Sequence, residues 1–323
     1  MGPDYIYAAA RVRSLETSLL TKSDMDALLS CKDYETALGL VRSNGWGGSS
    51  ASSMDEEKIL NYETEKTWAT VRDLIGDNEV MDVIRLPRRY HNLKAAIKAA
   101  ACGKPEGEIF YEGTGIEPDD LIDIIRKGNT EKLPPEMRLC SDEAFKSFAH
   151  TGNGQMSEAI IDAACLADMA SRAKKTDVAL VREYAEFFVA SADIRIAYRC
   201  ASTGRPKDFT GRSLVECTGL DKARLLQSAM SGTTALYSYL NETIYRDCVP
   251  ELQKGSAAFE RWVDNSLMKI ISSGKTDSFT AGAIAAYAVA RQTEIKNVRI
   301  ILSGKRNGIS DGLIAERIRE TYV

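Results

Sequence analysis

The chain has 323 residues, of which 44% are hydrophobic and 27% charged. This composition is typical of a folded globular protein and excludes a largely disordered one. The net charge of −4 argues against a general nucleic-acid binder, which needs a concentrated basic face. The seven cysteines are scattered along the chain, a pattern typical of reduced, buried thiols in a cytosolic protein.

The sequence contains no segment that predicts direct membrane insertion. The opening residues MGPDYIYAAARVR lack the apolar core of a signal peptide. The most apolar window, residues 281–290, is about half as long as the roughly 20 residues that cross a bilayer. Any membrane association is therefore expected to occur through other proteins, without a direct lipid anchor.

The N-terminal residues predict a series of short helices. Apolar residues recur at helical spacing from Tyr5 to Glu16 and predict an amphipathic helix. Ser23, with Asp26 three residues later, is predicted to cap a second helix. A third helix is expected from Asp33 to Val41. The Gly- and Ser-rich residues 43–53 then predict a linker.

Long helices follow this linker. Ser53 and Glu56 match a capping box and predict a helix from Met54 to about Ile75. Residues 77–101 continue the helical pattern, with a break expected at Leu86–Pro87 because the residue before a proline disfavours helical geometry. Further helices are predicted over residues 119–127, 156–175, 176–201, 276–302 and 309–322. Strand-like alternation is nearly absent, so the predicted fold class is all-α.

One stretch of sequence occurs three times. The copies are Asn92–Lys104, Asp193–Arg205 and Glu294–Lys305, and their opening polar residues are 101 positions apart. A fixed internal period predicts related structural units. The first two copies are followed by a turn and a short helix. The third lacks this partner, whereas residues 18–38 near the N-terminus match it.

The period predicts three helical repeats related by pseudo-threefold symmetry. Repeat 1 is expected over residues 54–152 and repeat 2 over 153–256. Repeat 3 is expected over residues 257–323 and is completed by residues 1–42, with 43–53 as the linker. In the first copy, Gly103 is predicted to end the helix.

Basic residues recur at matching positions of the three copies. The candidate partner-contact residues are Lys94, Lys98, Arg195, Arg199, Lys296 and Arg299. One interpretation is that they lie on solvated helix faces and complement the helix dipoles. The other is that they contact an acidic partner element near the pseudo-threefold axis. Reversing the charges of Lys94, Arg195 and Lys296 would distinguish these, because only the second interpretation predicts weaker partner docking.

No catalytic, cofactor or metal site is expected. Residues 273–276, SGKT, lack the earlier glycine and the preceding strand of a phosphate-binding loop. His91 and His150 lie outside any cluster with metal-ligand spacing. No Ser or Cys occupies a recognisable nucleophile motif. The sequence therefore does not predict an enzyme.

These features together resemble a known family. The N-terminal pattern Y-x-A-A-R-x-R-x-L-E begins at Tyr7, LLTKSDMDALLSCKDYETALGLV follows, and EIKNVRIILSGKRNG lies near the C-terminus. The combination resembles the C subunit of the archaeal and bacterial V/A-type rotary ATPases, the counterpart of the d subunit in eukaryotic V-ATPases. The resemblance covers essentially the whole chain and is one of diffuse helical similarity.

The resemblance implies a non-catalytic part that couples rotation. Such proteins are funnels of three helical bundles around a central cavity, located on the cytoplasmic face of the membrane. They connect the rotor ring of proteolipid subunits to the central shaft, which is made of the D and F subunits. The complex transports H⁺ or Na⁺ while hydrolysing or synthesising ATP. The resemblance implies no cofactor for the subunit itself.

Two other functions are compatible with the residues alone. The first is an all-α repeat scaffold for protein–protein interaction, unrelated to ATPases. The second is an all-α enzyme, although no residue constellation supports it. A rotor subunit is expected to sediment with membranes and to copurify with an ATP-hydrolysing complex, and a scaffold is not.

Overall fold

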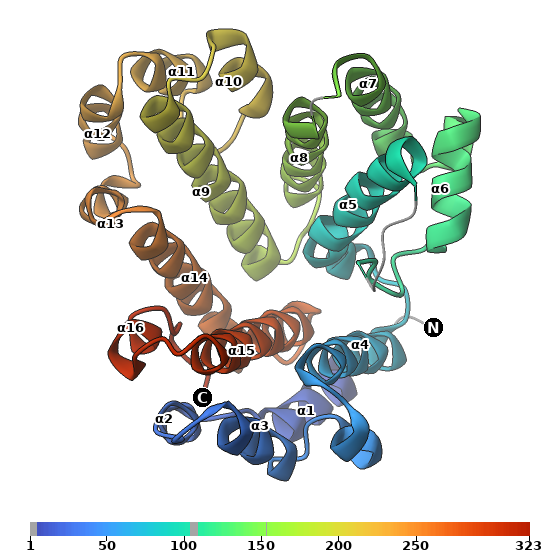
Figure 1. Cartoon of the computed structure of the whole chain (residues 1–323), viewed down its shortest axis with the longest axis vertical. Coiled ribbons are helices and arrows are strands. Elements are labelled where there is room, and N and C mark those ends of the chain that lie inside the picture. Colours follow the sequence, from blue (N-terminus) through green and yellow to red (C-terminus); the bar gives the residue numbers. More distant parts are fainter. Residues whose placement is uncertain (1–4, 104–108, 153) are drawn as a thin grey trace. The chain divides into compact units, whose positions relative to one another are not determined.

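The computed structural model describes residues 5–103, 109–152 and 154–323. Over these residues the regular secondary structure is helical, apart from one isolated β-bridge between Cys217 and Leu220. The predicted all-α class is confirmed (Figure 1). Within the described part of the chain, no helix has both the length and the hydropathy needed to cross a membrane.

The chain divides into two compact units. Unit 1 contains Met1–Met81, Val178–Tyr184 and Lys254–Val323. Its helices are α1 (Tyr5–Glu16), α2 (Lys22–Leu29), α3 (Tyr34–Ser43), the 3-10 helix η1 (Gly48–Ser53), α4 (Glu56–Ile75), α14 (Ser256–Ser272), the 3-10 helix η4 (Ser273–Thr276), α15 (Gly282–Arg306) and α16 (Asp311–Ala315). Helices α4 and α15 lie side by side (Figure 1).

Unit 2 contains Asp82–Asp177 and Ala185–Gln253. It includes most of three helices, α5 (Glu79–Cys102), α9 (Ala179–Thr203) and α13 (Val249–Lys254). Its other elements are α6 (Pro118–Lys127), η2 (Thr130–Lys132), α7 (Pro135–Thr151), α8 (Gly154–Ala173), α10 (Lys207–Ser213), α11 (Lys222–Met230), α12 (Thr233–Asn241) and η3 (Arg246–Cys248). Helices α7 and α8 pack against each other.

The hydrophobic core of unit 1 is built from both ends of the chain. Met25 and Leu28 of α2 pack in one cluster with Leu60 of α4 and with Val298 and Ile301 of α15. All five side chains are almost completely removed from solvent, and each large buried side chain contributes roughly 1.5–3 kcal/mol. The N-terminal helices are therefore anchored on α15. The division into three repeats stays a prediction.

Two helices begin at caps other than the predicted ones. Helix α2 follows Thr21 rather than Ser23: the Thr21 hydroxyl accepts the Asp24 N–H at 3.3 Å, and the Asp24 carboxylate accepts the Thr21 N–H at 2.8 Å. The Thr21 hydroxyl also donates to the Asp24 carboxylate at 2.7 Å, and this bond and the one from the Thr21 N–H hold the pKa of Asp24 below its ordinary value. Helix α4 follows Asp55, whose carboxylate accepts the Lys58 N–H at 2.9 Å. The capping box predicted just before α4 is therefore wrong.

The predicted break at Pro87 is also wrong, because α5 continues through this residue. A proline inside a helix loses one backbone hydrogen bond. The flanking residues Met81, Leu86 and Tyr90 are nearly inaccessible to solvent, so tertiary packing of this helix face offsets the local cost. Gly103 ends α5 as predicted, with φ of 92° and its N–H donated to the Ala99 carbonyl.

The C-terminal region contains less helix than predicted. Instead of a helix over residues 309–322, it has the short α16 and an irregular segment in which Tyr322 is buried. Helix α15 continues past Gly304, where the absence of a side chain admits Ile314. A Cβ atom added to Gly304 would lie 2.6 Å from the Ile314 side chain.

A buried ionic cluster connects α4, α15 and the segment before α4. Arg291 donates to Glu63 at 2.7 Å and also to Glu294. These three side chains are only 8%, 2% and 6% exposed. The Arg291 guanidinium lies 5.1 Å from the centre of the Trp46 ring, and Gly47 donates its N–H to Glu63 at 3.0 Å. Part of the predicted linker is thus packed against the unit 1 core.

Candidate functional site: the repeated basic positions

The three repeated stretches lie on the long helices α5, α9 and α15. The first stretch forms the C-terminal part of α5, and Lys104 at its end lies outside the described residues. The second occupies the C-terminal part of α9. The third lies within α15. The predicted site residues therefore occupy comparable helical positions, two sets of them in unit 2 and one in unit 1.

The opening polar residues of the three stretches are buried and bind the backbone. Asn92 donates to the Tyr111 carbonyl at 2.8 Å and accepts the Tyr111 N–H at 2.9 Å. Asp193 accepts the Val215 N–H at 3.2 Å. Glu294 accepts the N–H of Leu20 at 2.5 Å. Each therefore holds the segment that leads into a short helix, namely α6, α11 or α2.

The sequence contained one signal for this shared role. Asn92, Asp193 and Glu294 are equally spaced polar residues, and the apolar residue that follows each of them is also buried. The three polar side chains are at most 6% exposed. Periodicity assigns polar residues to the surface, so it did not predict their burial. Buried polar groups require partners, and here the partners are backbone groups of a distant segment.

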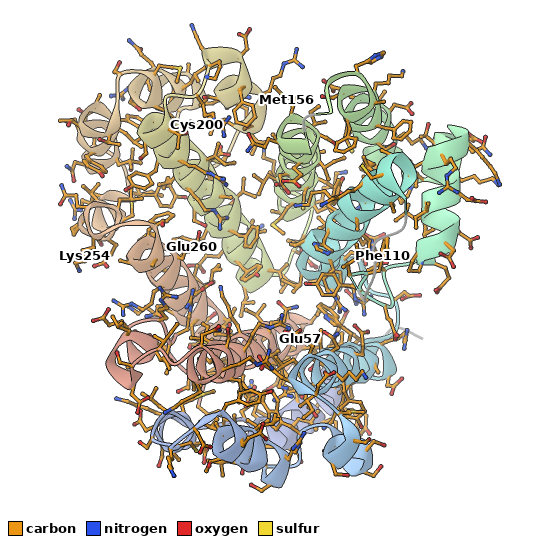
Figure 2. The ribbon with its side chains drawn as sticks, viewed as in Figure 1. Glu57, Phe110, Met156, Cys200, Lys254 and Glu260 are labelled. Atoms are coloured by element: carbon orange, nitrogen blue, oxygen red, sulfur yellow. The ribbon has the colours of Figure 1, made fainter. Side chains whose placement is uncertain are left out.

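Three of the predicted contact residues form ion pairs within the chain. Lys94 of α5 lies 2.7 Å from Asp162 of α8. Lys296 of α15 lies 2.5 Å from Asp264 of α14. Arg299 lies 3.2 Å from Glu57 on α4, which is labelled in Figure 2. At these positions the basic residues connect neighbouring helices, an arrangement that the sequence interpretation did not include.

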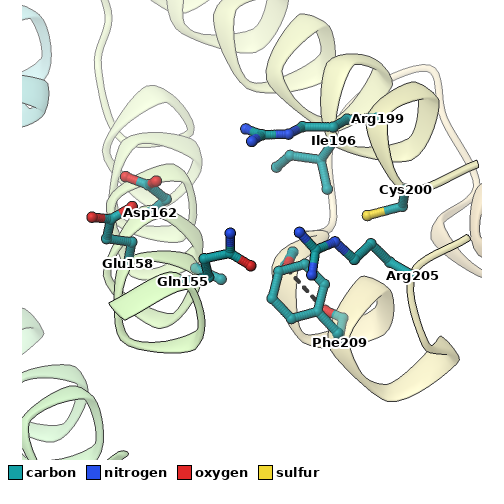
Figure 3. A pocket seen from close by; sticks show the side chains of 10 residues that line it. Gln155, Glu158, Asp162, Ile196, Arg199, Cys200, Arg205 and Phe209 are labelled. Carbon is teal, nitrogen blue, oxygen red and sulfur yellow. Dashed lines mark hydrogen bonds between the residues drawn. The ribbon is translucent and has the colours of Figure 1, made fainter. Parts of the chain in front are cut away.

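The other three predicted residues, Lys98, Arg195 and Arg199, are exposed. Among the described residues, neither Lys98 nor Arg199 forms an ion pair. Arg199 extends from α9 toward α8 (Figure 3). Lys98 and Arg199 thus match the expected properties of partner-contact residues more closely than the paired lysines do.

Arg199 lines a cleft of about 150 Å³ within unit 2. One wall is formed by α8 and contains Glu158 and Asp162. The opposite wall contains Arg199 of α9 and Arg205, with Phe209 of α10 nearby (Figure 3). Because Asp162 also binds Lys94, two of the predicted basic positions are associated with the same cleft.

The cleft has charges of both signs on opposite walls. No ion pair crosses it among the described residues, so Glu158 and Arg199 can each meet a bound group. The Arg205 guanidinium lies 5.5 Å from the centre of the Phe209 ring, which orients this arginine by a cation–π contact. Such a cleft suits a partner segment that carries both acidic and basic side chains.

The sequence features that resembled ligand sites have structural roles. The SGKT residues form η4 directly after the helix α14, and Lys275 donates to the Tyr322 carbonyl at 2.5 Å. His91 lies within α5, with its Nε2 2.9 Å from the Ile109 carbonyl oxygen. In the described part of the chain, no group of three His, Cys, Asp or Glu side chains is arranged to hold a metal ion.

The family model and the relatives that match this chain all name the same kind of subunit. The family model for the ATP synthase (C/AC39) subunit matches residues 8–317. The chain is 20% identical over 317 residues to the C subunit of the V-type sodium ATPase of Enterococcus hirae, covering 96% of this chain and 97% of that protein. It is 24% identical over 336 residues to the C subunit of the V-type ATP synthase of Thermus thermophilus, covering 98% and 99%. It is 22% identical to the C subunit of the A-type ATP synthase of Methanocaldococcus jannaschii, covering 99% and 86%.

Proposed function

Because the chain belongs to the ATP synthase (C/AC39) subunit family, we propose that it is the rotor part that couples the membrane ring of a V/A-type ATPase to the central shaft. The observation that carries this proposal is the extent of the family match, residues 8–317. Relatives named as the C subunits of such enzymes also align over nearly their full length. Family membership removes the alternative of a scaffold unrelated to ATPases.

In the proposed role the protein transmits rotation and catalyses no reaction itself. Its proposed partners are the proteolipid subunits of the rotor ring and the D and F subunits of the shaft. Densely packed helices suit a part that transmits torque, since protein interiors have low compressibility and transmit strain. We expect three helical bundles, as the repeated stretches predict, and a central cavity between them, as the family resemblance implies. The protein requires no nucleotide, metal or other cofactor of its own.

The proposed location is the cytoplasmic face of the membrane, where the protein is held through the rotor ring. The proposed transported ion is H⁺ or Na⁺; one relative is named as a subunit of a sodium ATPase and another as a subunit of an ATP synthase. The complex either synthesises ATP or hydrolyses it. No contact with nucleic acid and no direct lipid anchor form part of the proposal.

The experiment that tests the assembly role is affinity purification of the tagged full-length chain from detergent-solubilised membranes of its native host. We expect the ring proteolipid and the D and F subunits to be recovered in fixed proportion, together with ATP hydrolysis activity. Chemical cross-linking before purification should identify direct neighbours. Recovery of the chain alone from the soluble fraction, with no other ATPase component, would contradict the proposal.

The contact residues can be tested separately from the fold. Lys94 and Lys296 hold ion pairs within the chain, so reversing their charges would disturb the protein itself. Arg199→Glu and Lys98→Glu leave those pairs intact. If these residues contact the partner, each substitution should weaken assembly by about three- to tenfold, the effect expected for one charge at an interface.

A matched control lies in the same unit. Arg246 is also exposed, with its side chain 74% accessible and its Nε 3.9 Å from the exposed neighbour Asp247, but it lies outside the repeated stretches. Arg246→Glu should leave recovery of the partners unchanged. Equal recovery of the partner subunits with Arg199→Glu and with Arg246→Glu would assign the repeated basic residues to solvated helix faces. The coupling role would still be tested separately by the purification of the unaltered chain.

A further inference from the structure

The residues 214–220, called here the strap, connect α10 to the N-cap of α11. Leu214, Val215 and Leu220 of the strap are buried. Val215 donates its N–H to the two Asp193 carboxylate oxygens at 3.3 and 3.2 Å, and the Cys217 thiol lies 3.8 Å from one of them. The strap is therefore held by the burial of these apolar side chains and by a polar attachment to the Asp193 carboxylate of α9.

Asp193 differs from its two counterparts in how its charge is compensated. Asn92 performs the same task with a neutral amide. Glu294 is a carboxylate, but Arg291 binds it directly. Asp193 is completely buried, and among the described residues it forms no ion pair. A buried carboxylate without a bound cation is strongly disfavoured in its ionised form.

The groups around Asp193 do not remove this penalty. The pKa of Asp193 is raised to about 7, mainly by burial and in small part by Glu216 of the strap, although the Val215 N–H, Lys222 of α11 and the Cys217 thiol act to lower it. Other titratable groups near the strap are Lys174, Glu186 and Tyr245. None of them is hydrogen-bonded to Asp193.

One side of the strap borders a cavity. Glu216, Cys217 and Thr218 line a cavity of about 230 Å³ together with Lys174 and Glu186. The strap is thus not closely packed on this side. Its second polar attachment is the hydrogen bond that Tyr245 donates to the Thr218 carbonyl at 3.0 Å.

We propose that Asp193 is a protonation switch for the strap: the neutral carboxyl holds residues 214–220 on α9, and the ionised carboxylate releases them toward solvent. Release hydrates the carboxylate and exposes the Cys217 thiol. The switch is a property of unit 2 and does not depend on the assembly role proposed above.

The sign of the pH dependence follows from linkage. The closed strap binds the Asp193 proton more tightly than the open strap does, so opening is favoured as pH rises between the ordinary pKa of an aspartate and about 7, and it levels off above that. The opening equilibrium should change about tenfold per pH unit inside this window.

The test is hydrogen exchange of the purified full-length chain, resolved to the peptide that covers residues 214–220 and expressed as protection relative to intrinsic rates. Protection of Val215 should fall by more than about tenfold between pH 5 and pH 7. In Asp193→Asn, which copies the natural Asn92 arrangement, protection should be independent of pH. The segment around Tyr111, held by Asn92, serves as the internal control.

Thiol labelling gives a second readout. The labelling rate of Cys217 divided by that of the exposed Cys102 cancels the common effect of pH on thiolate formation. This ratio should rise with pH in the unaltered chain and stay constant in Asp193→Asn. Constant Val215 protection in the unaltered chain across this pH range would overturn the proposal, even if Asp193→Asn failed to fold. An undiminished pH response in a folded Asp193→Asn chain would overturn it as well.

Discussion

Replacing Arg291 with methionine tests how the buried ionic cluster stabilises unit 1. Methionine is a shorter unbranched side chain with no charge, so Arg291→Met removes the shared cation while filling much of its volume. Glu63 and Glu294 are then left buried without their guanidinium partner. The Trp46 ring also loses its cation–π contact.

The expected loss is large. Removing one member of a buried ion pair typically costs about 3–5 kcal/mol, because the remaining charge stays desolvated. Here the two carboxylates are 2% and 6% exposed, so solvent screening is small. We therefore expect Arg291→Met to reduce the free energy of unfolding of unit 1 by about 3–5 kcal/mol.

Tryptophan fluorescence during urea unfolding is a suitable assay. The three tryptophans, Trp46, Trp68 and Trp262, all belong to unit 1, so their emission reports on this unit. The pH dependence provides a further check. Burial raises the pKa of Glu294, and loss of Arg291 should raise it more. A neutral carboxyl carries no uncompensated charge, so Arg291→Met should lower the free energy of unfolding less at about pH 5 than at about pH 8.

A matched control on the same helix and in the same unit is Arg299→Met, which breaks the exposed pair with Glu57 and should cost less than about 1 kcal/mol. Glu63→Gln and Glu294→Gln, added to Arg291→Met, should recover a large part of the loss. A loss below about 1 kcal/mol for Arg291→Met would refute the reasoning. A loss of unfolding free energy that is equal at acidic and alkaline pH would refute it as well.

Two further substitutions in unit 1 test local geometry with the same fluorescence assay. Thr21→Ala should lower the free energy of unfolding by about 1 kcal/mol through loss of the N-cap of α2, whereas Ser23→Ala should be nearly neutral. A larger loss with Ser23→Ala than with Thr21→Ala would instead identify Ser23 as the cap, as predicted from the sequence. Gly304→Ala should destabilise by roughly 1–2 kcal/mol, because the added methyl group contacts Ile314 and outweighs the helix-propensity gain of about 1 kcal/mol. In an Ile314→Ala background, Gly304→Ala should stabilise the protein instead. An unchanged destabilisation there would exclude the contact with Ile314 as the cause.

Most of the helices could be predicted because their apolar periodicity is a local property. Tyr5–Glu16 has the same bounds in the sequence interpretation and in the structure. Helix ends were predicted less well. Thr21 and Ser23 are both good capping residues, and only the backbone geometry decides between them. Pro87 disfavours a helix locally, but the burial of Tyr90 and Leu86 depends on tertiary packing that no local rule contains.

The helical location of the candidate basic residues could be predicted, but the ion pairs that some of them form could not. The period located the basic residues, yet the Lys94–Asp162 pair joins residues 68 positions apart, and sequence spacing does not predict such a contact. Asp193 was recognised only as the opening residue of a repeat. Its burial and its bond to Val215 follow from the path of the chain after α10, which is a tertiary feature.

The bond between Leu20 and Glu294 spans 274 positions along the chain. A core with contacts of such long range forms slowly, since a large loop must close before its contacts become favourable. During synthesis, α1 to α3 leave the ribosome long before α15 is translated, so their apolar faces stay exposed during that time. Unit 1 can therefore complete its core only after translation of α15, and until then the apolar surface of its N-terminal helices favours aggregation.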